Sequence, residues 1–97
     1  MTDKELLELA ANAAEIDIQW FKHANGTTGG PYVGNSGWNP LTNDGDALRL
    51  AVKLGIDVGD AQFRWYDKTS TDPYAATRRA IVCAAAEIGK AEGEKDE

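Results

Sequence analysis

Arg78 is the residue whose chemistry most needs an explanation, because helical spacing places it within the apolar arc of a predicted helix. A guanidinium in such an arc must pair with a carboxylate or extend its charged end into water. Asp44, Asp46 and Asp67 are the candidate carboxylates. Arg78 and Arg79 also form the only adjacent basic pair in the chain, in the first turns of a helix where backbone N–H groups favour anions. A structural ion pair, a solvated side chain and a site for an anion or a partner therefore all remain open.

Trp38 and Arg49 are the other two candidate binding residues. Trp38 belongs to no periodic segment and stands just before a turn at Pro40. It is either a lid on the core or an exposed contact residue, since exposed tryptophans concentrate at protein interfaces. Arg49 follows Asp46 by three residues, a spacing that suits a surface ion pair worth about 0.3 kcal/mol. A contact between Arg49 and a partner or an anion is the alternative.

The remaining reactive residue types do not form a catalytic or metal-binding pattern. His23 is the only histidine and has no second histidine or cysteine at metal-ligand spacing, which excludes a zinc site and a histidine-based triad. Cys83, the only cysteine, has no base at a spacing that would activate it. The glycine-rich residues 25–31 lack the Lys-Ser/Thr ending of a phosphate-binding loop and are predicted to close a hairpin. We therefore expect a protein that is not an enzyme and that holds no metal or cofactor.

Residues 43–46 superficially resemble a calcium-binding loop, but their spacing favours a helix start. If Gly45 were the sixth residue of such a loop, Pro40 would be the first, where a carboxylate is required. Asn43 is instead a suitable N-cap, and Asp44 and Asp46 are favoured in the first turn by the helix dipole. These residues are assigned a structural role.

The helix that begins there is predicted to end at Gly55, a residue that tolerates the left-handed conformation after a last turn. Its apolar residues cover about 200° of the helix surface at 100° per residue. We expect such a helix to be covered on more than one side, by the sheet and by another helix. The residues of this arc are Ala47, Leu48, Leu50, Ala51, Val52 and Leu54.

Two further helices are predicted at the ends of the chain. Thr2 and Glu5 form a capping box, and Asp72 and Pro73 supply an N-cap followed by a proline at the first helical position. The last helix is rich in alanine, which allows close approach to a neighbour and is compatible with a homodimer. The predicted spans are residues 3–14 and 73–90. The expected buried face of the last helix consists of Tyr74, Ile81, Val82, Ala84, Ala85 and Ile88.

Short alternating segments predict strands between these helices. Residues 16–20 alternate apolar and polar, and the hairpin after them returns at residues 32–33. Residues 56–58 and 61–65 predict a second hairpin that turns at Gly59. The expected fold is α+β in the order α-β-β-α-β-β-α, with a small, mainly antiparallel sheet and three packed helices. Residues 1–91 form the predicted domain, and residues 92–97 an acidic flexible tail.

Charge and hydropathy exclude several classes of function. The chain has 16 acids and 10 bases, a net charge of −6, but the excess acid lies near the two ends. Residues 16–91 carry eight of each, which argues against general nucleic-acid binding. The apolar runs are too short for a membrane span, and the acidic start is unlike a signal peptide. A single cysteine fits a reducing compartment, so we expect a cytoplasmic protein.

Two stretches resemble a family of small proteins from tailed bacteriophages and prophages that is distantly similar to the NinX-like proteins of lambdoid phages. One stretch joins Trp38-Asn39-Pro40-Leu41 to residues 44–54, and the other joins Asp72-Pro73 to residues 75–82. The resemblance implies a phage or prophage origin and the host bacterial cytoplasm. It implies no activity and transfers no catalytic residue.

The expected function is that of a non-enzymatic accessory phage protein that binds a host or phage protein. Trp38, Arg49, Arg78 and Arg79 form the predicted binding surface. The alternative is an anti-defence sponge that holds an anionic nucleotide signal through Arg78, Arg79 and an aromatic residue.

Overall fold

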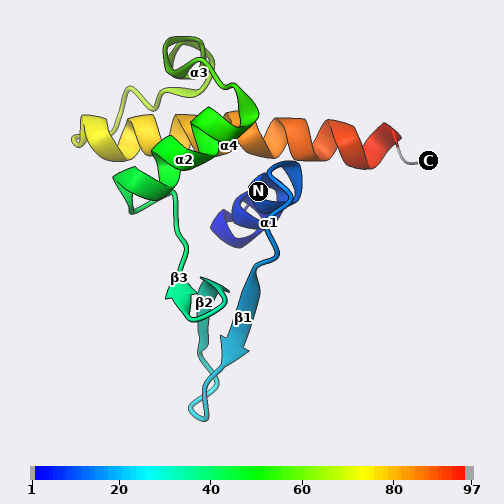
Figure 1. Cartoon of the computed structure of the whole chain (residues 1–97). Helices are drawn as coiled ribbons and strands as arrows, with labels where there is room; N and C mark the ends of the chain where they lie inside the picture. The colour runs from blue at the N-terminus through cyan, green and yellow to red at the C-terminus, as the bar shows by residue number, and fades with distance from the viewer. Residues whose placement is uncertain (1, 96–97) are drawn as a thin grey trace.

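The computed structural model describes residues 2–95, with side chains as far as residue 92, and has four helices and a three-stranded antiparallel sheet (Figure 1). The α+β class with a small antiparallel sheet is therefore confirmed. The expected element order was wrong, because the described chain runs α-β-β-β-α-α-α. One difference lies in residues 56–65, which were predicted to be a hairpin and contain a helix instead, and the other is a short third strand at residues 36–37 that was not predicted.

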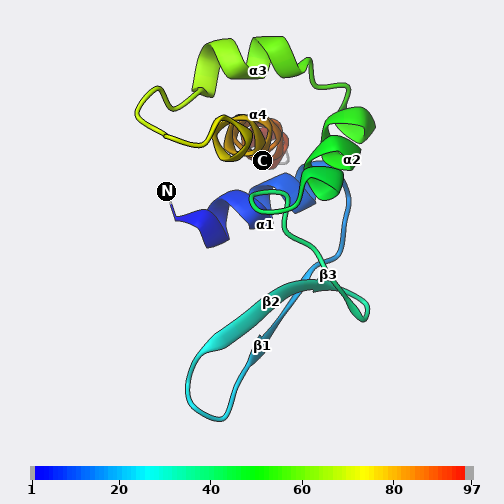
Figure 2. The same ribbon diagram turned by 90° about the vertical axis from the view of Figure 1, so that its left-hand side faces the viewer.

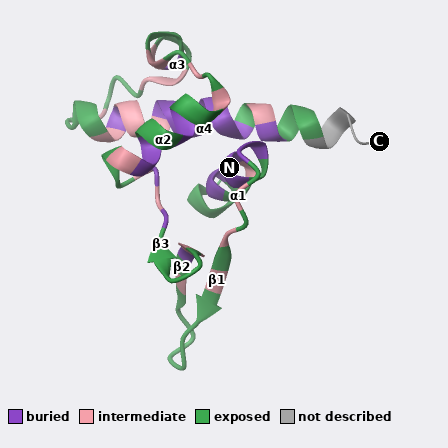
Figure 3. Cartoon of the chain, viewed as in Figure 1, coloured by how far each residue is buried: buried purple, intermediate pink, exposed green. Residues whose placement is uncertain are grey.

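Helix α4 (Pro73–Lys95) is the element on which the other helices pack. Figure 2 views it nearly end-on, with α1 (Asp3–Ala13), α2 (Asp44–Leu54) and α3 (Val58–Trp65) arranged around it. Figure 3 shows the buried residues gathered where these helices meet. Alanines make up much of this core, so the helix axes can lie close together. The larger buried side chains in it are Leu6, Leu7, Trp38, Leu50, Ile81 and Val82.

Helices α1 and α4 approach each other closely at Gly89. A Cβ atom built on Gly89 would overlap the backbone carbonyl oxygen of Leu9 and lie 3.5 Å from the Cβ of Ala13. Gly89 is itself buried. The absence of a side chain at this position therefore lets the two helix backbones come together.

Local capping sets the helix starts as the sequence predicts. The backbone N–H of Glu5 donates to Thr2 Oγ1 at 3.1 Å, and the N–H of Asp46 donates to Asn43 Oδ1 at 2.9 Å. Asp72 Oδ1 accepts from the first-turn N–H of Tyr74 at 2.9 Å. These three side chains satisfy N–H groups that have no partner within their own helix.

The predicted end of α2 is also confirmed, whereas α4 ends later than expected. Gly55 follows α2 in the left-handed conformation, with φ of 66°. Helix α4 continues to Lys95, beyond the expected end near Lys90. Of the predicted acidic tail, residues 96 and 97 lie outside the described part of the chain. Tyr74, expected on the buried face of α4, is 71% exposed because it lies in the first turn, at the edge of the helix packing.

Helix α2 is covered on one side, and the prediction of a second cover was wrong. Leu50 is 1% exposed and faces the core, but Leu48 is 60% and Val52 73% exposed. The reason is the position of the sheet, which extends away from the helical body instead of lying over the outer side of α2 (Figure 1).

Helix α3 replaces the predicted second hairpin. The side chain of Asp57 caps it by accepting from the N–H of Asp60 at 3.1 Å. Ala61 is buried against Ala80 and Ala84 of α4. The apolar positions of this short segment fit both a strand and one side of a two-turn helix, so tertiary packing and the Asp57 cap decide between them.

The sheet forms an arm that projects from the helices (Figure 2). Its strands are β1 (Gln19–Lys22), β2 (Thr28–Val33) and β3 (Ser36–Gly37), in the order β1-β2-β3. The first hairpin was thus predicted correctly, but β1 begins at Gln19, later than expected. Lys4 of α1 lies over the ring of Trp20, 5.4 Å from its centroid, and links the arm to the body.

Candidate functional site

Arg78 forms a structural ion pair, the first of the three interpretations of its place in an apolar arc. Its Nη1 donates to Asp44 Oδ1 at 2.6 Å, and its Nε donates to the backbone carbonyl of Leu41 at 2.8 Å. The side chain is 17% exposed. Arg78 therefore joins the start of α4 to the start of α2, and its Nε and Nη1 groups already donate hydrogen bonds within the chain.

Arg79 is engaged on a different side of the fold. Its Nη1 donates to Asp3 Oδ1 at 2.8 Å, which joins α4 to the first turn of α1. This hydrogen bond raises the pKa of Arg79 above its already high ordinary value. Although Arg78 and Arg79 are adjacent in sequence, their carboxylate partners belong to different helices. The structure does not direct the two guanidinium groups into one anion site.

Trp38 and Arg49 are brought together, in contrast to the two other candidate residues. Trp38 is 8% exposed and belongs to the core, which matches the lid interpretation. Arg49 donates to Asp46 Oδ1 at 2.8 Å, and the nearly buried Asp46 also accepts from the N–H of Asn39 at 3.0 Å through Oδ2. A shallow depression of about 440 Å³ is lined by Trp38, Arg49 and Lys53 among others. The binding roles of these residues stay predictions.

The described residues do not contain a metal-binding cluster, since no three or more of their histidine, cysteine and acidic side chains lie in a suitable group. No helix of residues 2–95 is both long and apolar enough to cross a membrane. Asp67, one of the three carboxylates considered as a partner of Arg78, forms a local turn instead. Hydrogen bonds from the side chain and backbone of Thr69 hold the pKa of Asp67 below its ordinary value.

Cys83 is a half-buried core residue, and burial raises the pKa of its thiol. Since the thiolate is the reactive form, alkylation by iodoacetamide near pH 8 should be several-fold slower in the folded protein than in the chain unfolded in urea. A time course followed by intact-mass measurement tests this. Equal rates in the two states would contradict the shielded position of the thiol.

An exposed apolar surface lies where α2 passes the start of α4. We call Leu48, Val52 and Tyr74, all more than half exposed, the α2–α4 face. Leu48 and Tyr74 line a hollow of about 370 Å³ whose wall also includes the paired Arg78. Sequence reasoning assigned all three residues of the face to the core. For Leu48 and Val52, the signal that could have identified them is the 200° apolar arc of α2, which is wider than one neighbouring helix can cover.

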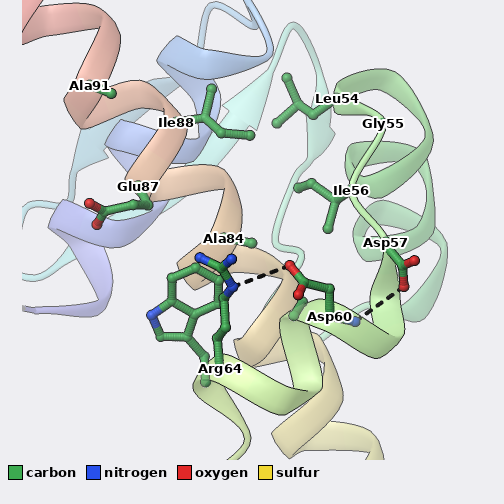
Figure 4. Close-up of a pocket in the computed structure, with 12 residues that line it drawn as sticks. Leu54, Gly55, Ile56, Asp57, Asp60, Arg64, Ala84, Glu87, Ile88 and Ala91 are labelled. Atoms are coloured by element: carbon green, nitrogen blue, oxygen red, sulfur yellow. Dashed lines mark hydrogen bonds and ion pairs between the residues drawn. The ribbon is translucent and has the colours of Figure 1, made fainter.

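A second surface, the α3–α4 groove, lies between α3, α4 and the end of α2 (Figure 4). It is an open groove of about 630 Å³. Leu54, Ile56 and Ile88 supply apolar side chains from three different segments, and Asp57, Asp60 and Glu87 supply carboxylates. The residues that line it are Leu54, Gly55, Ile56, Asp57, Asp60, Ala61, Arg64, Trp65, Ala84, Glu87, Ile88 and Ala91.

Comparisons of the chain with protein-family models, with curated proteins and with solved structures found no match. The case for a functional site therefore depends on the described residues themselves. They offer two partly apolar surfaces, the α2–α4 face and the α3–α4 groove.

Proposed function

We propose that this protein is a non-enzymatic accessory protein of a bacteriophage or prophage that binds a host or phage protein in the bacterial cytoplasm. The observation that carries the proposal is the exposed α2–α4 face. Leu48 and Val52 lie one turn apart on the uncovered side of α2, and Tyr74 lies beside Leu48 at the hollow. Contiguous apolar side chains of this size on a small protein mark interaction sites more often than isolated exposed ones do.

The sequence of α2 supports the same proposal from another direction. Its apolar residues spread over an arc wide enough for neighbours on two sides, but α4 covers only one of these sides. A partner protein that covers the second side would remove Leu48 and Val52 from water, which is worth about 1.5 to 3 kcal/mol for each fully buried side chain. The phage setting rests on the resemblance of residues 38–54 and 72–82.

The nucleotide-sponge alternative has less support. The guanidinium groups of Arg78 and Arg79 each donate to a carboxylate within the described chain. The charge of each arginine is thus already partly compensated, and a nucleotide phosphate would compete with Asp44 or Asp3 for it.

Removal of the α2–α4 face is expected to abolish partner binding without unfolding the protein. In the double variant Leu48→Gln and Val52→Gln, the Kd for the partner should rise at least about 100-fold, because both side chains would sit at the centre of the interface. The partner is first identified by capture on the tagged protein in bacterial cells, and its Kd is then measured with both proteins purified.

Phe63→Gln is the matched control, because Phe63 is 90% exposed on α3 and lies outside the α2–α4 face. It removes an apolar side chain that is more exposed than Leu48 or Val52 and should leave the Kd unchanged. Equal affinity of the double variant and the parent protein would refute the proposed surface. A melting-temperature shift with cyclic or ADP-ribose-type nucleotides that is lost in Arg78→Ala would favour the sponge instead.

A further inference from the structure

The α3–α4 groove combines an apolar floor with acidic sides. Leu54 ends α2, Ile56 lies in the linker before α3, and Ile88 belongs to α4, and in Figure 4 the three side chains lie around one hollow. Each of them is partly exposed. The floor is therefore built of three aliphatic side chains that the fold leaves incompletely covered.

The lining of the groove carries more negative than positive charge. Asp57 and Asp60 lie on the α3 side and Glu87 on the α4 side, against one cation among the lining residues, Arg64. The Arg64 side chain already interacts with other residues of the groove. Its Nε lies 3.3 Å from Asp60 Oδ2, and its guanidinium lies 5.9 Å from the centroid of the Trp65 ring. The sequence beyond the groove is acidic as well, because residues 92–97 contain four acids and one lysine.

We infer that this groove binds a basic amphipathic helix of the partner protein. The inference rests on the proposed function, since it takes the ligand to be a protein, and it adds the chemistry of the segment that is recognised. Apolar side chains on one side of such a helix would cover Leu54, Ile56 and Ile88, and lysine or arginine side chains beside them would meet Asp57, Asp60 and Glu87.

The dimensions of the groove suit a helix. The α4 residues that line it run from Ala84 to Ala91, which spans about 10 Å along the helix axis, or two turns. Two turns of a docked helix present apolar anchors at positions i, i+3, i+4 and i+7.

The test uses a synthetic peptide of about 14 residues with leucine at these helical anchor positions and lysine elsewhere, and a matched peptide with glutamate in place of lysine. Binding to the full chain is measured by fluorescence anisotropy of the labelled peptide, and the site is located by amide NMR shifts. The leucine–lysine peptide should bind, the leucine–glutamate peptide should not, and the shifts should fall in residues 54–65 and 84–91.

Glu87→Lys should weaken the leucine–lysine peptide about 10-fold, because it replaces an attraction with a repulsion in the groove. Asp17→Lys is the control: Asp17 is exposed, lies outside the groove and gives the same change in net charge. It should change the Kd by less than about twofold. Equal weakening by both variants, binding of the glutamate peptide, or no binding of the lysine peptide would overturn the inference.

The two proposals can fail separately. The double variant Leu48→Gln and Val52→Gln leaves the groove intact, so it should bind the leucine–lysine peptide as the parent protein does. If the double variant loses the peptide and Glu87→Lys keeps it, the groove inference is overturned and the α2–α4 face remains the docking surface. If Glu87→Lys alone loses the peptide but the double variant keeps its natural partner, the groove inference stands and the proposed role of the α2–α4 face fails.

Discussion

Replacing Gly89 with alanine is expected to lower the free energy of unfolding by about 2 to 4 kcal/mol, the range of severe overpacking in a close-packed interior. The added methyl group would overlap the carbonyl oxygen of Leu9. That oxygen belongs to the backbone of α1 and cannot rotate away as a flexible side chain can. The overlap can be relieved only if α1 shifts along α4 or away from it, and this shift would loosen the contacts of Ala10 and Ala13 as well. Urea denaturation followed by circular dichroism measures the change.

Whether Gly89→Ala lowers or raises the free energy of unfolding distinguishes an effect of packing from an effect of helix propensity. In an exposed helix interior, a change from glycine to alanine stabilises by about 0.8 to 1 kcal/mol. Gly59→Ala in α3 is the control, because its Cβ would meet the end of the Asp57 side chain at 3.2 Å rather than the backbone of another helix. We expect a change within about 0.5 kcal/mol for Gly59→Ala. A stabilised Gly89→Ala variant would show that α1 and α4 do not pack closely at this residue.

Truncation of Leu50 and Leu48 should give sharply different losses of stability, although both are leucines in the same helix. Leu50 is 1% exposed and packs in the core, so Leu50→Ala should lower the free energy of unfolding by about 2 to 4 kcal/mol. Leu48 is exposed, and Leu48→Ala should cost no more than about 0.5 kcal/mol in the isolated protein. Thermal or urea unfolding of the two variants under the same conditions provides the comparison.

When affinity for the purified partner is measured instead of stability, Leu48→Ala should have the larger direct effect. Leu48→Ala should weaken the complex, since Leu48 belongs to the proposed interface, whereas Leu50→Ala should act mainly through the stability of the free protein. Equal losses of stability for the two variants without a partner would mean that Leu48 is covered within the single chain. That result would remove the main support for the α2–α4 face.

The two proposed surfaces both include residues at the junction between α2 and α3. Val58 lines the hollow at the α2–α4 face, and Ile56 and Asp57 line the groove. A partner that contacted both would cover this linker and restrain α3, which has only two turns and packs on α4 through Ala61. The binding of such a partner would therefore also stabilise the fold.

Several properties of the candidate site followed from residue types alone. The capping residues Asn43 and Asp72 were identified correctly, because an N-cap acts on N–H groups within three residues of itself. The need of Arg78 for a carboxylate was also predicted, and Asp44 was among the candidates. Its backbone acceptor at Leu41 was not, because a carbonyl 37 residues away becomes a neighbour only in the folded chain.

The sequence alone determined where three helices start and the α+β class. Only the tertiary structure decided that residues 58–65 are helical, that α1 and α4 meet at Gly89, and that α2 is covered on one side. The physical reason is the range of the interactions. Caps and turns depend on neighbours a few residues apart, whereas burial depends on which distant elements meet. Leu48 and Leu50 contribute equally to the apolar pattern of α2, and the packing of α4 against one side of that helix makes one a core residue and the other a surface residue.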